Sequence, residues 1–219
     1  MIKQPKIYLV HAQRVSMGPI EAAFRSLWPE ARIAHLLEDS LFADFGHDGR
    51  LTEAMIERFR ALGRYCVAAG ADAILFTCSA FGPAIDAVKR DQRIPVLKPN
   101  EALYDELIAR GGRIALLATF APTITSMSAE ISAHAKQKVS ALALDTHLVG
   151  GALGALMAHR PDEHNRLIAE AACAFPDHDA IAFGQFSMAS ARALAEARTC
   201  VPILTTPDSA IRKLKTLMA

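Results

Sequence analysis

The sequence predicts an α/β protein with two pseudo-symmetric halves, each a parallel sheet flanked by helices. Three observations lead to this prediction. Strand-like and helix-like segments alternate along the chain of 219 residues, the strand-like segments are short apolar runs, and several motifs recur at one constant shift in residue number. Alternating strands and helices form right-handed βαβ units. Continuous apolar runs are typical of parallel strands that are covered on both faces.

The first half contains four strand-like segments separated by helical patterns. The predicted strands are residues 6–12 (KIYLVHA), 31–37, 72–77 (DAILFT) and 94–97 (IPVL). The predicted helices are residues 20–27, 51–69, 81–90 and 101–110. Thr52 has the residue type and position of an N-cap for the second helix, and Gly70 is placed to end it.

The second half repeats this order. The segment RIALLAT starts at Arg113 and matches the strand that starts at Lys6, a shift of 113 − 6 = 107. DAIAF at Asp179 follows DAILF at Asp72 by the same shift, VPI follows IPV, and Leu144 and Leu148 fall on Leu37 and Leu41. We interpret the pattern as an internal duplication; the alternative is two βαβ halves of similar composition. The predicted domains are residues 1–98, completed by the C-terminal segment 207–219, and residues 99–206.

Composition excludes several classes of function. The net charge is +1 and Lys and Arg are not clustered, so no nucleic-acid partner is expected. No apolar run approaches the roughly eighteen residues that cross a membrane, and the chain enters a strand at once, which predicts a cytoplasmic protein. The four cysteines and eight histidines lack metal-ligand spacing, and no glycine-rich phosphate loop follows a strand. We therefore expect neither a metal nor a cofactor.

The strand at 72–77 ends in a thiol. Cys78 follows the strand where a helix is predicted to begin, and Pro83 suits the first helical turn. We expect the backbone N–H groups of Ser79 and Ala80 to be free donors for a substrate carboxylate. The positive end of the helix is expected to lower the pKa of the Cys78 thiol. The alternative is a small buried residue that ends a strand.

Gln185 is the equivalent of Cys78 at the shift of 107. An amide can orient a substrate through hydrogen bonds, but it cannot transfer protons near neutral pH. Parallel sheets bind ligands at the carboxyl ends of their strands. We therefore expect an active-site cleft between the two halves, with Cys78 on one side and Gln185 on the other.

The duplicated halves, the DAILFTCSA strand end and the following IPV strand resemble the aspartate/glutamate racemase superfamily. That superfamily includes hydantoin racemases, maleate isomerases and arylmalonate decarboxylases. The resemblance implies a small carboxylate substrate, cofactor-independent chemistry by cleft thiols, and a homodimer. By position, Cys78 matches the first catalytic cysteine of the family, and Ser79 matches a residue that holds carboxylate oxygens. Thr119 and Thr123 resemble the family's threonine-rich substrate loop, with one extra residue in the spacing.

This chain also departs from the pattern. Gln185 replaces the second catalytic cysteine, and Phe186 and Ser187 stand near the place where glutamate racemases carry a histidine. We assign these three residues to substrate binding. Ser79 and Ala80 replace the Asn-Thr pair of glutamate racemases, which makes free glutamate or aspartate a doubtful substrate.

With one thiol, three functions stay open. They are one-base isomerisation of a small carboxylate, cofactor-free decarboxylation of a malonate-like acid, and carboxylate binding without catalysis. His11 ends the first strand, and its equivalent at the shift of 107 is Ala118. We expect His11 to keep Cys78 ionised or to act as a second acid/base. The alternative is a histidine that caps the strand through backbone hydrogen bonds.

Overall fold

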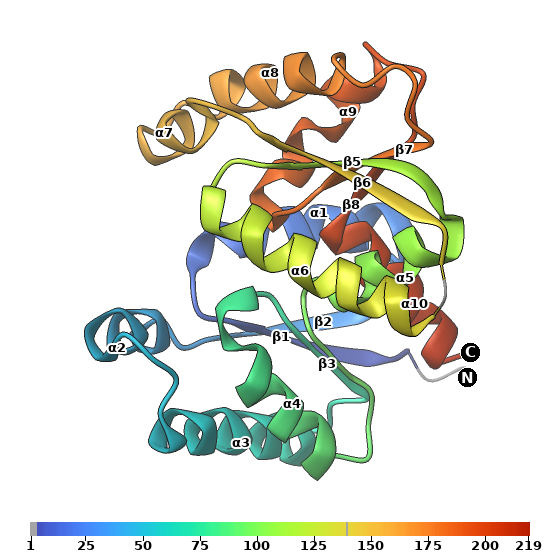
Figure 1. The fold of residues 1–219 in the computed structure, drawn as a ribbon. Coiled ribbons are helices and arrows are strands. Elements are labelled where there is room, and N and C mark those ends of the chain that lie inside the picture. Colours follow the sequence, from blue (N-terminus) through green and yellow to red (C-terminus); the bar gives the residue numbers. More distant parts are fainter. Residues whose placement is uncertain (1–3, 139) are drawn as a thin grey trace. The chain divides into compact units, whose positions relative to one another are not determined.

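The computed structural model describes residues 4–138 and 140–219, and it contains two four-stranded parallel sheets (Figure 1). The first has the order β2-β1-β3-β4, and the second has the equivalent order β6-β5-β7-β8. The strands are β1 (Lys6–His11), β2 (Arg32–Leu37), β3 (Ala73–Phe76), β4 (Val96–Leu97), β5 (Gly112–Ala118), β6 (Leu142–Leu148), β7 (Ala180–Phe183) and β8 (Ile203–Thr205). The predicted α/β fold with two similar halves is confirmed.

Helices lie on both faces of each sheet (Figure 1). Those of the first half are α1 (Met17–Leu27), α2 (Ser40–Asp48), α3 (Glu53–Ala68) and α4 (Gly82–Asp91), with 3₁₀ turns at Arg14–Ser16 and Ser79–Phe81. Those of the second half are α6 (Ala121–Gln137), α7 (Ala152–Met157), α8 (Pro161–Ala172) and α9 (Arg192–Glu196), with a 3₁₀ turn at Phe186–Ala191.

The contacts of the chain divide it into two compact units. The first ends at Ala102 and also includes Ala210–Ala219, and the second is Leu103–Ser209. The boundaries between the units therefore fall within two helices, α5 (Glu101–Arg110) and α10 (Thr206–Leu217), so that part of each helix is assigned to each unit. Lys215 of α10 donates a hydrogen bond to the backbone oxygen of Leu27 at 3.0 Å, which ties the C-terminal helix to the first unit.

The backbone hydrogen bonds of the two units repeat with the shift of 107. The N–H of Asp72 donates to the backbone oxygen of Lys6 at 2.8 Å, and that of Asp179 donates to Arg113 at 2.8 Å. In the first sheet Ile7 pairs with Ala73, and the pair related by this shift has the same register in the second sheet. The two central pairings are thus equivalent residue by residue.

The second strands of the two halves are not equivalent at the shift of 107. Ile7 pairs with Ile33 in the first sheet, whereas Ile114 pairs with Leu144 in the second. Leu144 is therefore equivalent to Ile33, at a shift of 111, and its predicted match with Leu37 is wrong. The chain between these paired positions is four residues longer in the second half, so the shift of 107 does not extend across it.

Alternating residues of the first sheet pack into different cores. One cluster joins Val10, Ile74 and Phe76 to side chains of α3 and α4, and the rings of Phe59 and Phe76 are tilted by 32° with centroids 5.6 Å apart. The helix α1 covers the opposite face of this sheet (Figure 1). This alternation decides which side chains at the strand ends can meet.

Local sequence signals account for the ends of α3. The side chain of Thr52 accepts a hydrogen bond from the backbone N–H of Met55 at 3.3 Å, so the predicted N-cap is confirmed. Gly70 follows the helix with φ +81°, which a side chain would strain. The helix α2 was not predicted, because its nine residues include Gly46 and two aspartates and give a weak helical pattern.

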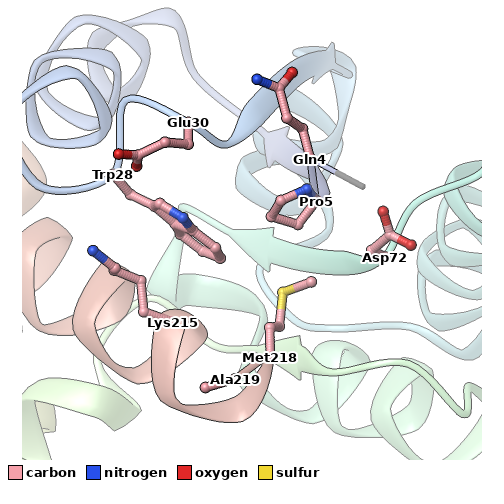
Figure 2. Close-up of a pocket in the computed structure, with 8 residues that line it drawn as sticks. All are labelled: Gln4, Pro5, Trp28, Glu30, Asp72, Lys215, Met218 and Ala219. Atoms are coloured by element: carbon pink, nitrogen blue, oxygen red, sulfur yellow. The ribbon is translucent and has the colours of Figure 1, made fainter. Parts of the chain in front are cut away.

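A pocket of about 660 Å³ lies at the amino ends of the first sheet (Figure 2). Its walls include Trp28, Asp72 and Met218, and the ammonium of Lys215 lies 6.0 Å from the centre of the Trp28 ring. Trp28 precedes β2 and Asp72 precedes β3, so the pocket is at the opposite edge of the sheet from Cys78.

Gly63 allows α3 and α4 to approach closely. A Cβ atom at this position would lie 2.5 Å from Cγ1 of Val88. We expect Gly63→Ala to lower the free energy of unfolding by about 1–3 kcal/mol, because Val88 is fully buried and its branched side chain has little freedom to move. Urea denaturation measures the loss. Gly46→Ala is the matched control, since nothing lies within 4 Å of its Cβ; equal stabilities of the two variants would contradict this account.

Candidate functional site

Cys78 is the first residue beyond the last hydrogen bond of β3. The backbone N–H of Thr77 donates to the oxygen of Val10 at 3.1 Å, and the chain then enters the 3₁₀ turn at Ser79–Phe81. The side chain of Cys78 is half-buried and packs against the core cluster of α3 and α4. The helix α4 begins only at Gly82, so the turn separates the thiol from the helix end.

Burial raises the pKa of the Cys78 thiol, and a hydrogen bond from the backbone N–H of Ala80 offsets only part of this effect. The predicted lowering of the pKa is therefore wrong. Its physical reason is that apolar packing penalises the thiolate more than one backbone donor stabilises it. At neutral pH the side chain is a neutral thiol, which is able to donate a proton.

Gln185 occupies the equivalent place after β7. The backbone N–H of Gly184 donates to the oxygen of Leu117 at 2.9 Å, as Thr77 does to Val10. Oε1 of Gln185 accepts two hydrogen bonds from Thr119, one from the backbone N–H at 2.7 Å and one from the hydroxyl at 3.0 Å. Because a backbone N–H can only donate, the oxygen of the amide must face Thr119. The Nε2 group of Gln185 is thereby left to donate elsewhere.

The remaining predicted binding residues fall into different environments. Ser79 and Ala80 are exposed beside Cys78, whereas Phe186 is buried with 6% exposure. Ser187 is half-buried, and its backbone oxygen lies 3.4 Å from Nε2 of the buried His164. Thr123 lies in the first turn of α6 rather than in a loop. The structure thus brings together Cys78 with Ala80 in the first unit and Thr119 with Gln185 in the second.

His11 is fully buried at the carboxyl end of β1. Its Nδ1 lies 2.8 Å from the hydroxyl of Thr77 and 3.0 Å from that of Ser16, and its Nε2 lies 3.0 Å from Nδ1 of His35. Burial, and secondarily the neighbouring His35, lowers the pKa of His11 to about 4. The imidazole is therefore neutral at pH 7.

The expected electrostatic role of His11 is therefore wrong, since a neutral ring cannot hold Cys78 as a thiolate. Geometry gives a second reason. His11 contacts Thr77, and consecutive strand residues point to opposite faces of the sheet, so Thr77 and Cys78 face different layers. A direct acid/base role of His11 stays a prediction.

Sequence reasoning missed four residues around this histidine: Ser16, Glu21, His35 and Thr77. Glu21 of α1 completes the set, because its Oε1 lies 3.2 Å from Nε2 of His35. One available signal was His11 itself, because a histidine at the end of an apolar strand is buried and needs a hydrogen-bond partner. The four residues come from three separate segments of the chain, which a linear pattern does not connect.

Within residues 4–138 and 140–219, no group of three or more His, Cys, Asp or Glu side chains is arranged to hold a metal ion. None of the described helices combines the length and apolarity needed to span a membrane.

The lowered pKa of His11 predicts an acid-dependent loss of stability. Between about pH 6.5 and 4 the unfolded chain binds a proton at this histidine and the folded chain does not. The contribution of the neutral His11 side chain to the free energy of unfolding is complete above pH 6.5 and is lost as the pH falls from 6.5 to about 4. We expect the difference in stability between pH 7.5 and pH 4.5 to be smaller in His11→Gln than in wild type, as measured by urea denaturation. His47→Gln, an exposed control, should keep the wild-type difference; an unchanged difference in His11→Gln would contradict the assignment.

Comparisons with known proteins give a matching family and several proteins of similar fold. The family described as Asp/Glu/Hydantoin racemase matches residues 43–214. An aspartate racemase homologue from Pyrococcus horikoshii superimposes with a TM-score of 0.71 at 16% identity, over 98% of this chain and 99% of that one. Allantoin racemase from Klebsiella pneumoniae gives 0.68 at 18% identity, over 98% and 88%. A mutant of arylmalonate decarboxylase gives 0.66 at 18% identity, over 97% and 93%.

None of the curated proteins compared with the sequence matches it. The structural likenesses have low sequence identity and establish the fold alone, and the family match covers more than three quarters of the chain. The protein belongs to the Asp/Glu/hydantoin racemase family.

Proposed function

We propose that this protein is a cofactor-independent isomerase that acts on a small carboxylate or a related carbon acid through the thiol of Cys78. The observation that supports this most is the difference between two equivalent strand ends. One carries a thiol with a backbone N–H from Ala80, and the other carries Gln185, whose oxygen is held by Thr119. Two-base racemisation needs a proton acceptor on each face of the substrate carbon, and an amide cannot be one.

A single thiol suits reactions on one face of the substrate. As a thiolate, Cys78 would remove a proton from the carbon next to the carboxylate and, as a thiol, return it to a neighbouring carbon. This moves a double bond with no net change in protons. Interconversion of a hydroxy group and a neighbouring keto group also transfers the hydroxyl proton to the carbonyl oxygen through solvent. The exposed Ser79 and the Nε2 group of Gln185 are donors suited to the carboxylate. Whether both strand ends face one substrate stays a prediction, as do the homodimer and the cytoplasmic location.

A second candidate, decarboxylation, is favoured by the raised pKa of Cys78. A neutral thiol is a proton donor. Loss of CO₂ from a malonate-like acid leaves a carbanion, which takes the thiol proton, and water then returns a proton to the thiolate. An arylmalonate decarboxylase is among the proteins with a similar fold. Carboxylate binding without turnover is the third candidate function.

The test is proton NMR of small carboxylates in D₂O, including hydroxy acids, malonates and maleate, with wild type and Cys78→Ser compared. We expect deuterium incorporation or product signals with wild type and a loss of at least roughly 100-fold in the variant, because the serine hydroxyl is a far weaker acid than a thiol and does not ionise near neutral pH. Cys173→Ser, which changes an exposed thiol, should behave as wild type. Binding of a carboxylate without exchange in any sample would contradict catalysis and support a binding protein.

Gln185 is expected to bind rather than to react. For a substrate identified in this way, Gln185→Leu should raise KM by about 10- to 100-fold, since a hydrogen bond to a charged group contributes about 1.5–3 kcal/mol. The turnover number should change less than KM, because the amide transfers no proton. Steady-state kinetics measure both. A large fall in kcat at constant KM would instead place Gln185 in the chemical step.

A further inference from the structure

A line of polar side chains runs from solvent to the residue before Cys78. It begins at Glu21 of α1, which is partly exposed, and continues through His35 of β2, the buried His11 of β1 and the hydroxyl of Thr77. The three contacts measure 3.2, 3.0 and 2.8 Å in that order. The rings of His11 and His35 are 17° from parallel, with centroids 5.1 Å apart.

When both imidazoles are neutral, one placement of protons satisfies the three contacts of this line. Oε1 of Glu21 lies 3.2 Å from Nε2 of His35, and a carboxylate only accepts, so its charge favours a proton over a lone pair on Nε2. Nδ1 of His35 is then bare and accepts from Nε2 of His11. Nδ1 of His11 is in turn bare and accepts from the hydroxyl of Thr77. The opposite tautomer of His11 would require a proton on Nδ1 of His35. The lone pair on Nε2 of His35 would then face the carboxylate of Glu21.

We propose that Glu21 and His35 are positioning residues that keep the proton of His11 on Nε2, so that Nδ1 of His11 accepts from Thr77 and fixes the end of β3 from which Cys78 emerges. The Thr77 hydroxyl has other acceptors within reach, the backbone oxygen of Val10 at 3.4 Å and the hydroxyl of Ser16 at 2.8 Å. The bond to His11 selects among them. In this respect the inference rests on the proposed function, in which Cys78 is the reacting group.

Protonation of His35 reverses the direction of the hydrogen bonds between His35, His11 and Thr77. A cationic His35 donates from Nδ1 to His11, whose own proton must then sit on Nδ1 and point toward Thr77 and Ser16. The ionisable side chains in contact with His35, among the residues that the structure describes, are Glu21 from α1 and His11 from β1. At the same end of the strands, Arg14 and Asp39 are exposed and pair with each other at 3.7 Å.

The experiment reads the tautomer directly. Long-range ¹H–¹⁵N correlation spectra of protein labelled in histidine, without substrate at pH 8, report which ring nitrogen of His11 is protonated. We expect Nε2–H in wild type and a mixture of tautomers in Glu21→Ala, with Glu21→Asp or Glu21→Gln restoring part of the wild-type signal. Glu30→Ala, an exposed control, should leave the tautomer unchanged. A pure Nε2–H signal in Glu21→Ala overturns the proposal.

The second readout is the alkylation rate of Cys78 by iodoacetamide, in a background in which the exposed Cys173 and Cys200 are serine. We expect the rate in Glu21→Ala to differ from that of the parent by at least threefold and to vary with pH differently. A changed tautomer with an unchanged rate also overturns the positioning role. Both readouts are made without substrate, so their results do not depend on the turnover assay. Inactivity of Cys78 toward carboxylates would leave the tautomer result intact, and an unexpected tautomer would leave the turnover result intact.

Discussion

Parallel pairing of the first and third strands of each half is the constraint on which the rest of the structure depends. It places the residues after the strands at one edge of each sheet, and the bonds from Thr77 to Val10 and from Gly184 to Leu117 fix where each strand ends. The side chains that follow, Cys78 and Gln185, therefore emerge from backbones of the same geometry. What they can do then depends only on the side chains around them.

The two halves share this backbone and differ in the side chains at its strand ends. In the second half Ala118 and Gly184 stand where the first half has His11 and Thr77. A Cβ atom on Gly184 would lie 3.0 Å from the sulfur of Met127, so the second half has filled this space with an apolar side chain. The hydroxyl–imidazole contacts thus belong to the unit that carries the thiol, which is the expected arrangement if they serve it.

The sequence alone predicted most of the strands, the shift of 107 and the position of Cys78 after a strand, because these follow from local patterns that recur in both halves. It could not predict the pKa of Cys78, which is a balance between apolar packing and one backbone donor. The partners of His11 were also out of reach, since Thr77 is 66 residues away along the chain. The wrong match of Leu144 has a similar origin: the segment between the strands has changed length, and only pairing reveals the true equivalent.

The resting charges of the two strand ends bear on the direction of the proposed reactions. Cys78 is a neutral thiol, and Gln185 is held so that it can only donate from Nε2, so both strand ends offer hydrogens and neither carries a charge. A carboxylate bound near the thiol would raise its pKa further, because a like charge disfavours the thiolate. Steps in which Cys78 first gives a proton are therefore easier than steps in which it first takes one. An isomerase built on this thiol needs a substrate whose C–H group is made more acidic by a neighbouring carbonyl, whereas a decarboxylase needs only the carbanion that loss of CO₂ supplies.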